Sequence, residues 1–525
     1  MKKSFLIKGI LALLVGFVIF EACNTLDLQP LDKVTTTTYY KTAADFDGAT
    51  FAAYSSMQDL WGTSTETLSE RGEFYAISLT ATDDVDWNSK ASNGAGGTQN
   101  NKDLDNLLIR SSQTCWGAAY TQIYEGILRA NLVIEAAGGK DNQLTAAEKT
   151  KFIAEAKFLR AIYHFLAMQM WGTPPIVLEV KKDITALAVA NGTKDALFAA
   201  ILADLKDANA GLPDKWDAGN TGRATKWAAK AFEGKVNVWK KDWPAAIAAF
   251  EAVRAGAGYK LYDGNANKQD NYEDAFDFAK ENGPESIFEI QYGGPFSDDN
   301  LWVFDDTHSE AFKASQGTGR IWYWDPSGDA GAPGGGLGWQ IPSKNLVDEY
   351  EAGDPRLAAN IYKAGDTYYD RSSAAGTPYK PEWSGNGYTI RKYAGKRNAV
   401  SGAFSPNGQA SFNNERYFRY AELVLLYAEA LIESGKTAEG VAIINNEIRK
   451  RVGLGASPIA DAKKALQHER RVELAFEIHR WFDITRWGIG AQVFGAKWND
   501  KFNVFPFPQS EIDRSNGLLK QNAGY

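Results

Sequence analysis

Aromatic residues that lie close to short polar side chains are the features of this sequence best suited to bind a ligand. The chain of 525 residues contains 16 Trp and 23 Tyr, more than core packing usually needs. An indole or phenol ring can stack on the apolar face of a sugar, and Asp or Asn can hydrogen-bond its hydroxyl groups. We predict ligand contacts from two segments: Asp84, Trp87 and Asn88, and then Trp302, Trp322, Tyr323, Trp324 and Trp339.

Each of these aromatic residues has a structural alternative, which is a place in the hydrophobic core. The Trp-x-Trp spacing of Trp322 and Trp324 would point both rings to one side of a strand, which suits a core as well as a surface. Trp87 lies in a polar loop, about residues 83–105, which favours exposure. Five further tryptophans lie on predicted helices or at their ends and receive no ligand role: Trp116, Trp171, Trp227, Trp481 and Trp487.

A cluster of carboxylates and arginines over residues 469–486 is the strongest candidate for catalysis. Glu469, Glu473 and Glu477 recur every four residues, the spacing of one helical face, and arginines lie close enough to pair with them. We interpret the cluster as a salt-bridged helix and predict no catalytic residue. A glycoside hydrolase needs only two carboxylates, which no short motif reveals, so a surface enzyme stays open as an alternative.

Motifs for metals and cofactors are missing from the sequence. The four histidines show no His-Glu-x-x-His or other zinc spacing, and neither Gly-x-Ser-x-Gly nor a Walker-type loop occurs. We therefore predict no cofactor and no metal ligand, although a structural calcium ion would not be readable from sequence. The formal net charge of -8, with scattered Lys and Arg, argues against nucleic acid as a partner.

The first residues predict export. Lys2, Lys3 and Lys8 precede an apolar run over residues 9–20, which has the layout of a cleavable signal and is shorter than the roughly 20 apolar residues that span a bilayer. Cys23 directly after a small residue resembles a bacterial lipobox. We predict a lipid on Cys23 as the membrane contact, with an ordinary signal peptide and a chance cysteine as the alternative. Cys115 then has no disulfide partner.

Apolar residues recur at helical spacing over seven segments, which predicts a mainly α fold. The predicted helices cover residues 116–136, 146–170, 195–210, 225–239, 244–253, 420–431 and 438–449. Hairpins of about 34 residues with alanines at their crossing points resemble tetratricopeptide repeats, in which each unit buries its face against its neighbours. We therefore predict a tetratricopeptide-like scaffold of helical hairpins.

A long insertion interrupts this scaffold. Residues 285–292 are typical of a strand, and the remainder is punctuated by Gly and Pro rather than by periodic apolar residues. Because disordered segments seldom carry tryptophan, we predict an ordered, loop-rich insertion with short strands that forms the binding surface. The predicted parts are a signal peptide (1–22), a linker (23–40), the first scaffold part (41–255), the insertion (256–418), the second scaffold part (419–490) and a C-terminal segment (491–525).

Short motifs along nearly the whole chain resemble those of one family, the RagB/SusD nutrient-uptake lipoproteins of the Bacteroidetes outer membrane. The motifs are LDLQP (26–30), EAKFLRA (155–161), GRAT (222–225), ESIFEIQY (285–292), DPR (354–356), RYAE (419–422), YAEA (427–430), ERRVELAFE (469–477), RWFD (480–483), RWG (486–488) and QNAGY (521–525). Their order and number carry the resemblance. Ala523 departs from the proline usual in the family, and Phe507 from the usual isoleucine.

The resemblance implies a lipid-anchored protein of the outer membrane that faces the cell exterior. Its tetratricopeptide face would dock on a SusC-like TonB-dependent transporter barrel, and the protein would capture glycans and deliver them to that barrel without altering them. A loop like residues 83–105 and the segment after the strand supply ligand contacts in the family. Peptide binding on the same scaffold stays as the alternative, ahead of a surface glycoside hydrolase.

Overall fold

The computed structural model describes residues 39–61, 74–91, 98–183, 188–293, 318–333, 335–369, 376–394 and 411–525. The predicted signal peptide, the lipid on Cys23 and the predicted ligand contact of Trp302 lie outside the described residues. Within the described parts, no helix combines the length and the apolar character needed to cross a membrane.

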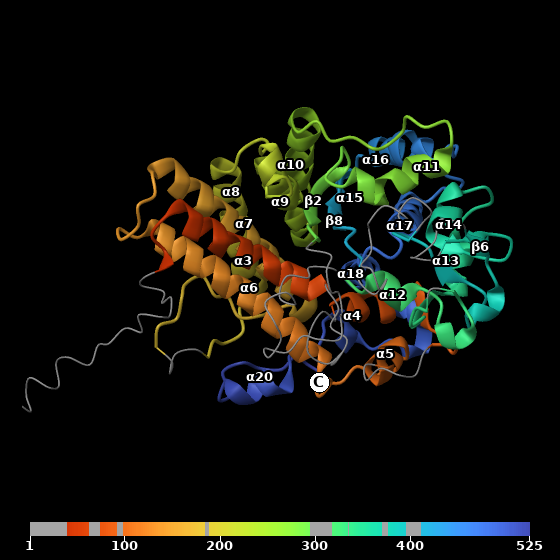
Figure 1. The fold of residues 1–525 in the computed structure, drawn as a ribbon, viewed down its shortest axis with the longest axis horizontal. Coiled ribbons are helices and arrows are strands. Elements are labelled where there is room, and N and C mark those ends of the chain that lie inside the picture. Colours follow the sequence, from red (N-terminus) through yellow and green to blue (C-terminus); the bar gives the residue numbers. More distant parts are fainter. Residues whose placement is uncertain are drawn as a thin grey trace, which may run out of the picture.

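Helices dominate the structure and stack on one another along the first half of the chain (Figure 1). α3 packs on α6, α6 on α7, α7 on α8, α8 on α9 and α9 on α10. The helices of the packing series are α3 (Ala43–Trp61), α6 (Cys115–Gly138), α7 (Ala146–Trp171), α8 (Lys194–Gly211), α9 (Lys226–Lys240) and α10 (Trp243–Gly256). The shorter helices α4 (Phe74–Thr80) and α5 (Thr98–Asp105) lie between α3 and α6 in the sequence. The predicted mainly α fold is confirmed.

Local sequence sets the ends of these helices. Thr145 and Glu148 form a capping box at the start of α7, and Gly172, with φ 73°, follows its last residue. In the turn between α9 and α10, Lys241 adopts the left-handed conformation and the Asp242 side chain accepts a hydrogen bond from the first turn of α10. Buried alanines on both helices allow their close approach.

The scaffold resumes after the insertion with α15 (Tyr420–Glu433), which packs on α10 and on α16 (Thr437–Ile443). α16 continues into a π-helical turn, η8 (Ile444–Arg449). The helices that follow are α17 (Ala462–Glu473), α18 (Arg480–Trp487), α19 (Gly490–Phe494) and α20 (Gln509–Arg514). All seven helices predicted from sequence are therefore present.

The strands of the described residues form four short antiparallel pairs. β2 (Ser286–Ile290) pairs with β8 (Glu415–Arg419), which joins the two ends of the insertion, and β1 (Val85–Trp87) pairs with β3 (Gln340–Pro342), which joins the first scaffold part to the insertion. The smaller pairs are β4 (Ile361–Tyr362) with β7 (Thr389–Ile390) and β5 (Thr367–Tyr368) with β6 (Thr377–Pro378). The short α-helices are α11 (Lys268–Glu273), α12 (Arg320–Trp324), α13 (Lys344–Glu349) and α14 (Pro355–Asn360). The 3-10 helices are η2 (Ala218–Asn220), η3 (Asp274–Phe276), η4 (Phe278–Lys280), η6 (Gly328–Ala330), η7 (Pro381–Trp383), η9 (Gly495–Lys497) and η10 (Asp500–Asn503).

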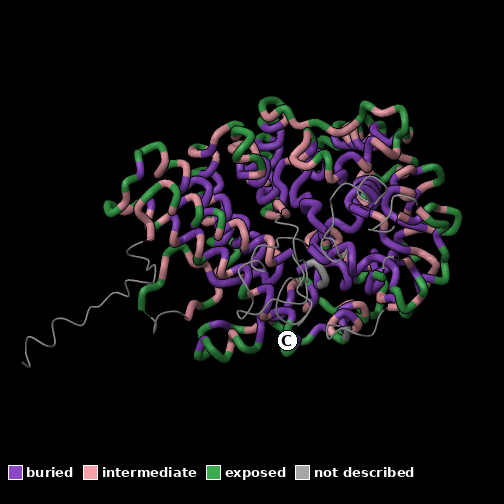
Figure 2. The backbone as a smooth tube through the Cα atoms, in the orientation of Figure 1, coloured by how far each residue is buried: buried purple, intermediate pink, exposed green. Residues whose placement is uncertain are grey.

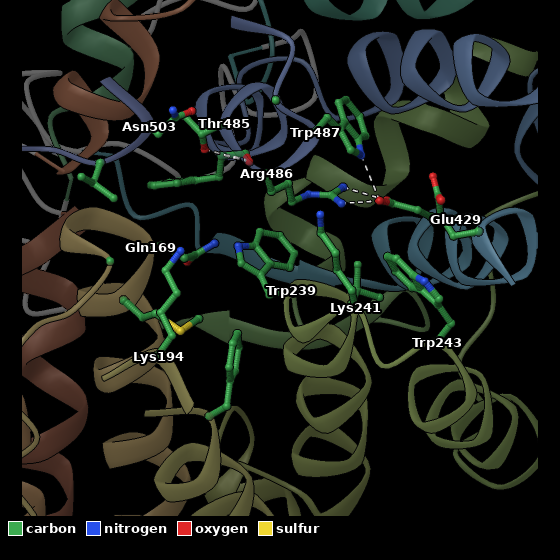
Figure 3. Close-up of a pocket in the computed structure, with 18 of the residues that line it drawn as sticks. Gln169, Lys194, Trp239, Lys241, Trp243, Glu429, Thr485, Arg486, Trp487 and Asn503 are labelled. Atoms are coloured by element: carbon green, nitrogen blue, oxygen red, sulfur yellow. Dashed lines mark hydrogen bonds and ion pairs between the residues drawn. The ribbon is translucent and has the colours of Figure 1, made fainter. Parts of the chain in front are cut away.

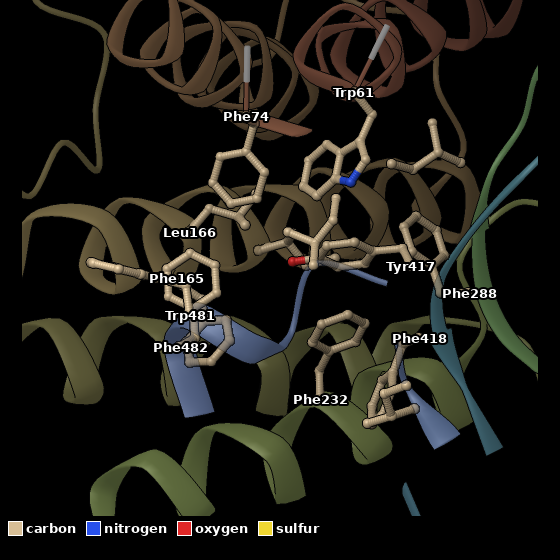
Figure 4. Packing of buried hydrophobic residues seen from close by; sticks show 14 of the residues in the cluster. Trp61, Phe74, Phe165, Leu166, Phe232, Phe288, Tyr417, Phe418, Trp481 and Phe482 are labelled. Atoms are coloured by element: carbon tan, nitrogen blue, oxygen red, sulfur yellow. The ribbon is translucent and has the colours of Figure 1, made fainter. Parts of the chain in front are cut away.

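An aromatic core lies where the scaffold meets β2 and β8 (Figure 4). Tyr417 contacts Phe232 of α9 and Trp61 of α3, with ring centroids 5.7 Å and 5.0 Å apart. Phe288 of β2 packs edge-on against Phe158 of α7. Buried segments run continuously from the helical stack into the insertion (Figure 2), so one core holds both parts.

Two local predictions are wrong. The Trp322 and Trp324 segment is the short helix α12 rather than a strand, so the two rings do not share one side as strand residues would. α17 ends at Glu473, so Glu477 is not on the helical face of Glu469 and Glu473. Phe476 and Ile478 adopt left-handed backbone conformations, with φ 63° and 69°, and these break the helix.

Candidate functional site

A stack of four aromatic rings runs from the insertion to the loop of the first half. Trp322 stacks on Tyr323, with ring centroids 6.2 Å apart, and Tyr323 on Trp339, at 4.7 Å and an interplanar angle of 9°. Trp339 stacks on Trp87 at 6.3 Å. The structure therefore brings together four residues that sequence analysis selected from segments more than two hundred residues apart.

Backbone hydrogen bonds hold this aromatic stack in register. The Leu337 and Trp339 amides donate to the Trp322 and Tyr323 carbonyls, both at 2.8 Å, and the Asn88 amide donates to the Trp339 carbonyl at 3.0 Å. The β1–β3 pair places Trp87 opposite Gln340. Strand pairing thus holds the backbone of Trp87 next to the buried rings of the stack.

Most of the predicted ligand-binding rings are buried, and the prediction of an exposed aromatic shelf is wrong for them. Trp322, Tyr323, Trp324 and Trp339 are 5%, 8%, 1% and 2% exposed. Trp324 packs beside Phe476, and its indole N–H donates to Gln340 at 2.8 Å. The physical reason is that large rings release the most free energy when they leave water, and these four rings belong to the core that the insertion shares with the scaffold.

Asp84 and Asn88 are also structural, which corrects their prediction as ligand contacts. Arg471 Nε donates to Asp84 Oδ1 at 2.8 Å; burial raises the pKa of Asp84 and this arginine opposes the rise. The side-chain Nδ2 of Asn88 donates to the Gly338 carbonyl at 2.7 Å, and its Oδ1 accepts from the Gly385 N–H at 2.8 Å. The polar atoms of both side chains are used within the protein.

Trp87 differs from the other rings of the stack because it is only partly buried. Lys102 Nζ lies 5.5 Å from the centroid of the Trp87 ring. The backbone N–H of Trp87 donates a hydrogen bond to Asp105 Oδ1 at 3.1 Å. Burial raises the pKa of Asp86, against the opposing effects of Asn386 and Lys497. Burial raises the pKa of Asp105 too, and the charge of Asp86 adds to that rise.

These polar neighbours complete a surface around Trp87 that sequence reasoning missed. Asp86 is exposed, and Lys102, Asp105 and Asn386 are partly buried. Asp86 was within the predicted polar loop, and the alternation along β1 could have identified it as an outward residue on the face of the strand opposite to Trp87. Lys102, Asp105 and Asn386 carry no signal of their own, since only the fold brings their elements together.

The carboxylate and arginine cluster is a buried ion network. Glu473 accepts hydrogen bonds from Arg356, Arg419 and Arg451, and Glu477 from Arg419 and Lys392. Burial alone would raise the pKa of Glu473, but the three guanidinium groups hold it well below its usual range. The prediction of ion pairs in this cluster is confirmed, but the pairs join α17 and Glu477 to other elements rather than running along one helix.

One group of the described residues has the composition of a metal site. Glu351, His468 and Glu469 bring potential ligand atoms within 4.8 Å of one another. Arg449 already donates to both carboxylates of this group, at 2.6 Å to Glu351. Because a cation would have to displace this guanidinium, we assign the group to the ion network rather than to a metal.

Comparison with known proteins identifies the family of this chain. A model described as "SusD family" matches residues 284–503, and one described as "Starch-binding associating with outer membrane" matches residues 57–238. The chain belongs to the SusD family. This confirms the resemblance seen in the sequence motifs.

Relatives of this SusD-family chain match it over nearly their full lengths. SusD-like protein P2 of Formosa agariphila is 27% identical, over 96% of this chain and 97% of the relative. Starch-binding protein SusD of Bacteroides thetaiotaomicron is 22% identical, over 96% of this chain and 95% of the relative.

Solved structures share the fold. A laminarin binding SusD-like protein superposes with a TM-score of 0.74 and 24% identity, over 93% of this chain and all of the other. Surface glycan-binding protein A of Bacteroides thetaiotaomicron, in complex with laminarihexaose, gives a TM-score of 0.72 and 22% identity, over 92% of this chain and all of the other.

Proposed function

We propose that this protein is a glycan-binding lipoprotein of the outer membrane, anchored through Cys23, that captures oligosaccharides or polysaccharides at the cell surface. It hands them to a SusC-like TonB-dependent transporter barrel and does no chemistry on them. Membership of the SusD family supports this function, as do relatives whose names record binding of starch, laminarin and laminarihexaose.

The observation that carries the proposal is the partly exposed ring of Trp87 at the outer end of a rigid aromatic stack. A sugar ring can stack on an indole that cannot move away, so little side-chain entropy is lost on binding. Lys102 Nζ lies 5.5 Å from the centroid of this ring, and Asp105 accepts a hydrogen bond from the Trp87 backbone N–H, so an ammonium and a carboxylate lie close enough to hydrogen-bond hydroxyl groups of a stacked sugar. The surface therefore has the apolar platform and polar rim that sugar recognition needs.

We also propose that the glycan is bound without hydrolysis. Trp87 presents a platform on the outside of the fold, whereas a glycosidase places an acid and a second carboxylate on either side of the bond that it cleaves. Asp86 and Asp105 are the carboxylates nearest to such a role, and we assign them to hydroxyl binding.

The test is affinity electrophoresis of the mature chain, expressed from Asn24, in gels that contain laminarin, starch, a fructan or a mannan. We expect one glycan to retard the protein and Trp87→Ala to lower that affinity at least about tenfold, equivalent to about 1.4 kcal/mol. Trp227→Ala is the matched control, since Trp227 is also partly buried and has a lysine over its ring, Lys226 at 4.6 Å.

Two results would contradict the proposal. Release of reducing ends from the retained glycan would show an enzyme. Retention by no glycan, together with binding to a peptide library, would favour the peptide-binding alternative. Loss of retention in Trp227→Ala equal to that in Trp87→Ala would move the binding surface away from Trp87.

A further inference from the structure

A second potential binding site lies on the helical scaffold, away from the residues of the Trp87 surface. This pocket of about 820 Å³ is formed at the end of α7, the start of α8, the turn between α9 and α10, and parts of α15 and α18 (Figure 3). Three partly buried tryptophans line it: Trp239, Trp243 and Trp487. Its volume is in the range of small-molecule sites and is much larger than a single ion requires.

Arg486 gives the pocket a rigid wall. Its guanidinium lies 4.7 Å from the ring centroids of both Trp239 and Trp487. The same group donates to Glu429 Oε2 at 2.7 Å and to Asp483 at 2.8 Å, and the Trp487 indole N–H donates to Glu429 at 2.9 Å. These contacts neutralise the charge of Arg486 and hold two of the three tryptophans in place before any ligand arrives.

Two lysines of the pocket have no such compensation. Lys463 pairs with Glu433 at 2.8 Å, but among the described residues no carboxylate lies within ion-pair distance of Lys194 or Lys241. Lys194 is the first residue of α8, where the positive end of the helix dipole disfavours a cation. Asp195 follows it but does not line the pocket. Both lysines are exposed and solvated, and a negatively charged group bound in the pocket would gain ion pairs with these two ammonium groups.

Trp243 supplies the apolar surface of the same pocket. Its ring is partly buried, and among the described residues no other ring stacks on it and no cation lies over it. Gln169, close to Trp239 in Figure 3, adds an amide that can hydrogen-bond a hydroxyl group. The pocket thus combines a partly buried indole that no other described ring covers, an amide, and two exposed ammonium groups without a carboxylate partner among the described residues.

We infer that this pocket binds an acidic oligosaccharide. The carboxylate or sulfate of the sugar lies between Lys194 and Lys241, and an adjacent sugar ring stacks on Trp243. A neutral glycan would leave both ammonium groups without a counter-charge. The inference does not depend on binding at Trp87, because the two sites share no residue.

Isothermal titration calorimetry of the mature chain tests it, with tetragalacturonate as the carboxylate probe and a sulfated galactan tetrasaccharide as the sulfate probe. The methyl ester of tetragalacturonate is the neutral control of equal length. We expect one or both acidic probes to bind at least tenfold more tightly than the ester, and binding to weaken as salt concentration rises. Whichever probe binds identifies the source of the negative charge.

The variants locate the site. Lys194→Gln/Lys241→Gln is expected to lower the affinity for the acidic probe at least tenfold, and Trp243→Ala at least fivefold. Lys260→Gln/Lys380→Gln is the control, since it changes net charge equally at two exposed lysines outside the pocket and should bind as the unmodified protein does.

Three results would overturn the inference. These are equal binding of acid and ester, unchanged binding by the pocket double variant, and an equal loss in the control double variant. If Trp87→Ala alone abolishes binding of the acidic probe, the acid binds at the Trp87 surface. The pocket inference then fails while the proposed glycan-binding function stands.

Discussion

Trp339 is the residue on which the position of Trp87 depends. It lies between Tyr323 and Trp87 in the aromatic stack and is 2% exposed, so its own ring is inaccessible to a ligand. It acts through Trp87, by limiting how far that ring can turn. Trp339 is therefore a positioning residue, and Trp87 is the residue that we expect to touch sugar.

We predict that Trp339→Ala lowers both stability and glycan affinity. The cavity should lower the free energy of unfolding by about 3–5 kcal/mol, measured from the shift of the thermal midpoint. Trp339→Phe keeps an aromatic ring behind Trp87 and should recover most of the affinity lost in Trp339→Ala. Full affinity in Trp339→Ala at a temperature where it remains folded would show that Trp87 needs no support.

His164 is a buried imidazole whose neutral form is built into α7. Nδ1 lies 3.0 Å from the Arg160 carbonyl and Nε2 accepts the Val177 N–H at 3.2 Å, so Nδ1 carries the proton. Burial lowers the pKa of His164 to about 4. Protonation of Nε2 would break the hydrogen bond from Val177.

We predict that the protein becomes less stable as the pH is lowered from about 6.5 to about 4. The unfolded chain takes up a proton on this residue near pH 6.5, whereas the folded chain does so only near pH 4. The folded state is therefore destabilised progressively between these values, by at most about 3 kcal/mol from this residue. The difference between the thermal midpoints at pH 7 and pH 5 should be smaller in His164→Gln. An identical difference would assign the pH dependence to other groups, of which His479, whose burial also lowers its pKa, is the first to examine.

At the scale of elements, the buried ion network joins α17 to the insertion. Glu473 of α17 accepts hydrogen bonds from Arg419, at the end of β8, and from Arg356 of α14 at 3.2 Å. Arg419 also donates to Glu285, directly before β2, at 2.7 Å. Three elements that are distant in sequence, α17, β8 and α14, therefore meet at the Glu473 carboxylate, and Arg419 links them to the start of β2.

We predict that Glu473→Gln destabilises the protein by about 3–5 kcal/mol, because three buried guanidinium groups lose a shared counter-charge. Asp348→Asn is the control: it breaks the exposed Lys344–Asp348 pair, 2.5 Å long, and should change stability by less than about 1 kcal/mol. Thermal midpoints at pH 7 measure both. A comparable change in thermal midpoint in the two variants would mean that the buried ion pairs of Glu473 contribute no more to stability than an exposed pair.

Regular elements of this fold could be predicted from sequence, and their ends could be predicted where a capping residue or glycine marks them. Helical periodicity identified the hairpins because their buried faces repeat at helical spacing. The end of α17 could not be predicted: the apolar and acidic spacing continues through Ala475, and the chain leaves the helix with non-glycine residues at positive φ. Such strain persists only where other contacts offset it, and here the ion pairs of Glu477 with Arg419 and Lys392 do so.

The site was predictable only in part, for a similar reason. Composition and local polarity identified Trp87 and the rings that back it, but they could not distinguish the exposed end of the stack from its buried members. That distinction depends on which elements cover each ring. The scaffold pocket was not predicted at all, because Trp487 was assigned to structure and the lysines of the pocket come from elements that are separate in sequence.

At the scale of the whole molecule, the two proposed binding surfaces lie on one continuous core. The Trp87 surface is built on β1, β3 and α5, and the pocket on α7 to α10, α15 and α18. Coupling between two sites requires an element with two arrangements that both ligands bias. Here both surfaces rest on elements held by the same buried hydrophobic core, which favours a single arrangement.

We therefore predict that the two ligands bind independently. Titration of the neutral glycan into protein saturated with the acidic tetrasaccharide should give the same affinity, within about twofold, as titration into free protein. Trp87→Ala should affect only the first ligand and Lys194→Gln/Lys241→Gln only the second. Competition between the ligands would mean that they share a surface, and a mutual increase in affinity would reveal a conformational change that links the insertion to the scaffold. Independent binding would allow one protein to hold a branched or mixed polysaccharide through a neutral segment and an acidic segment at the same time, with an affinity above that of either contact alone.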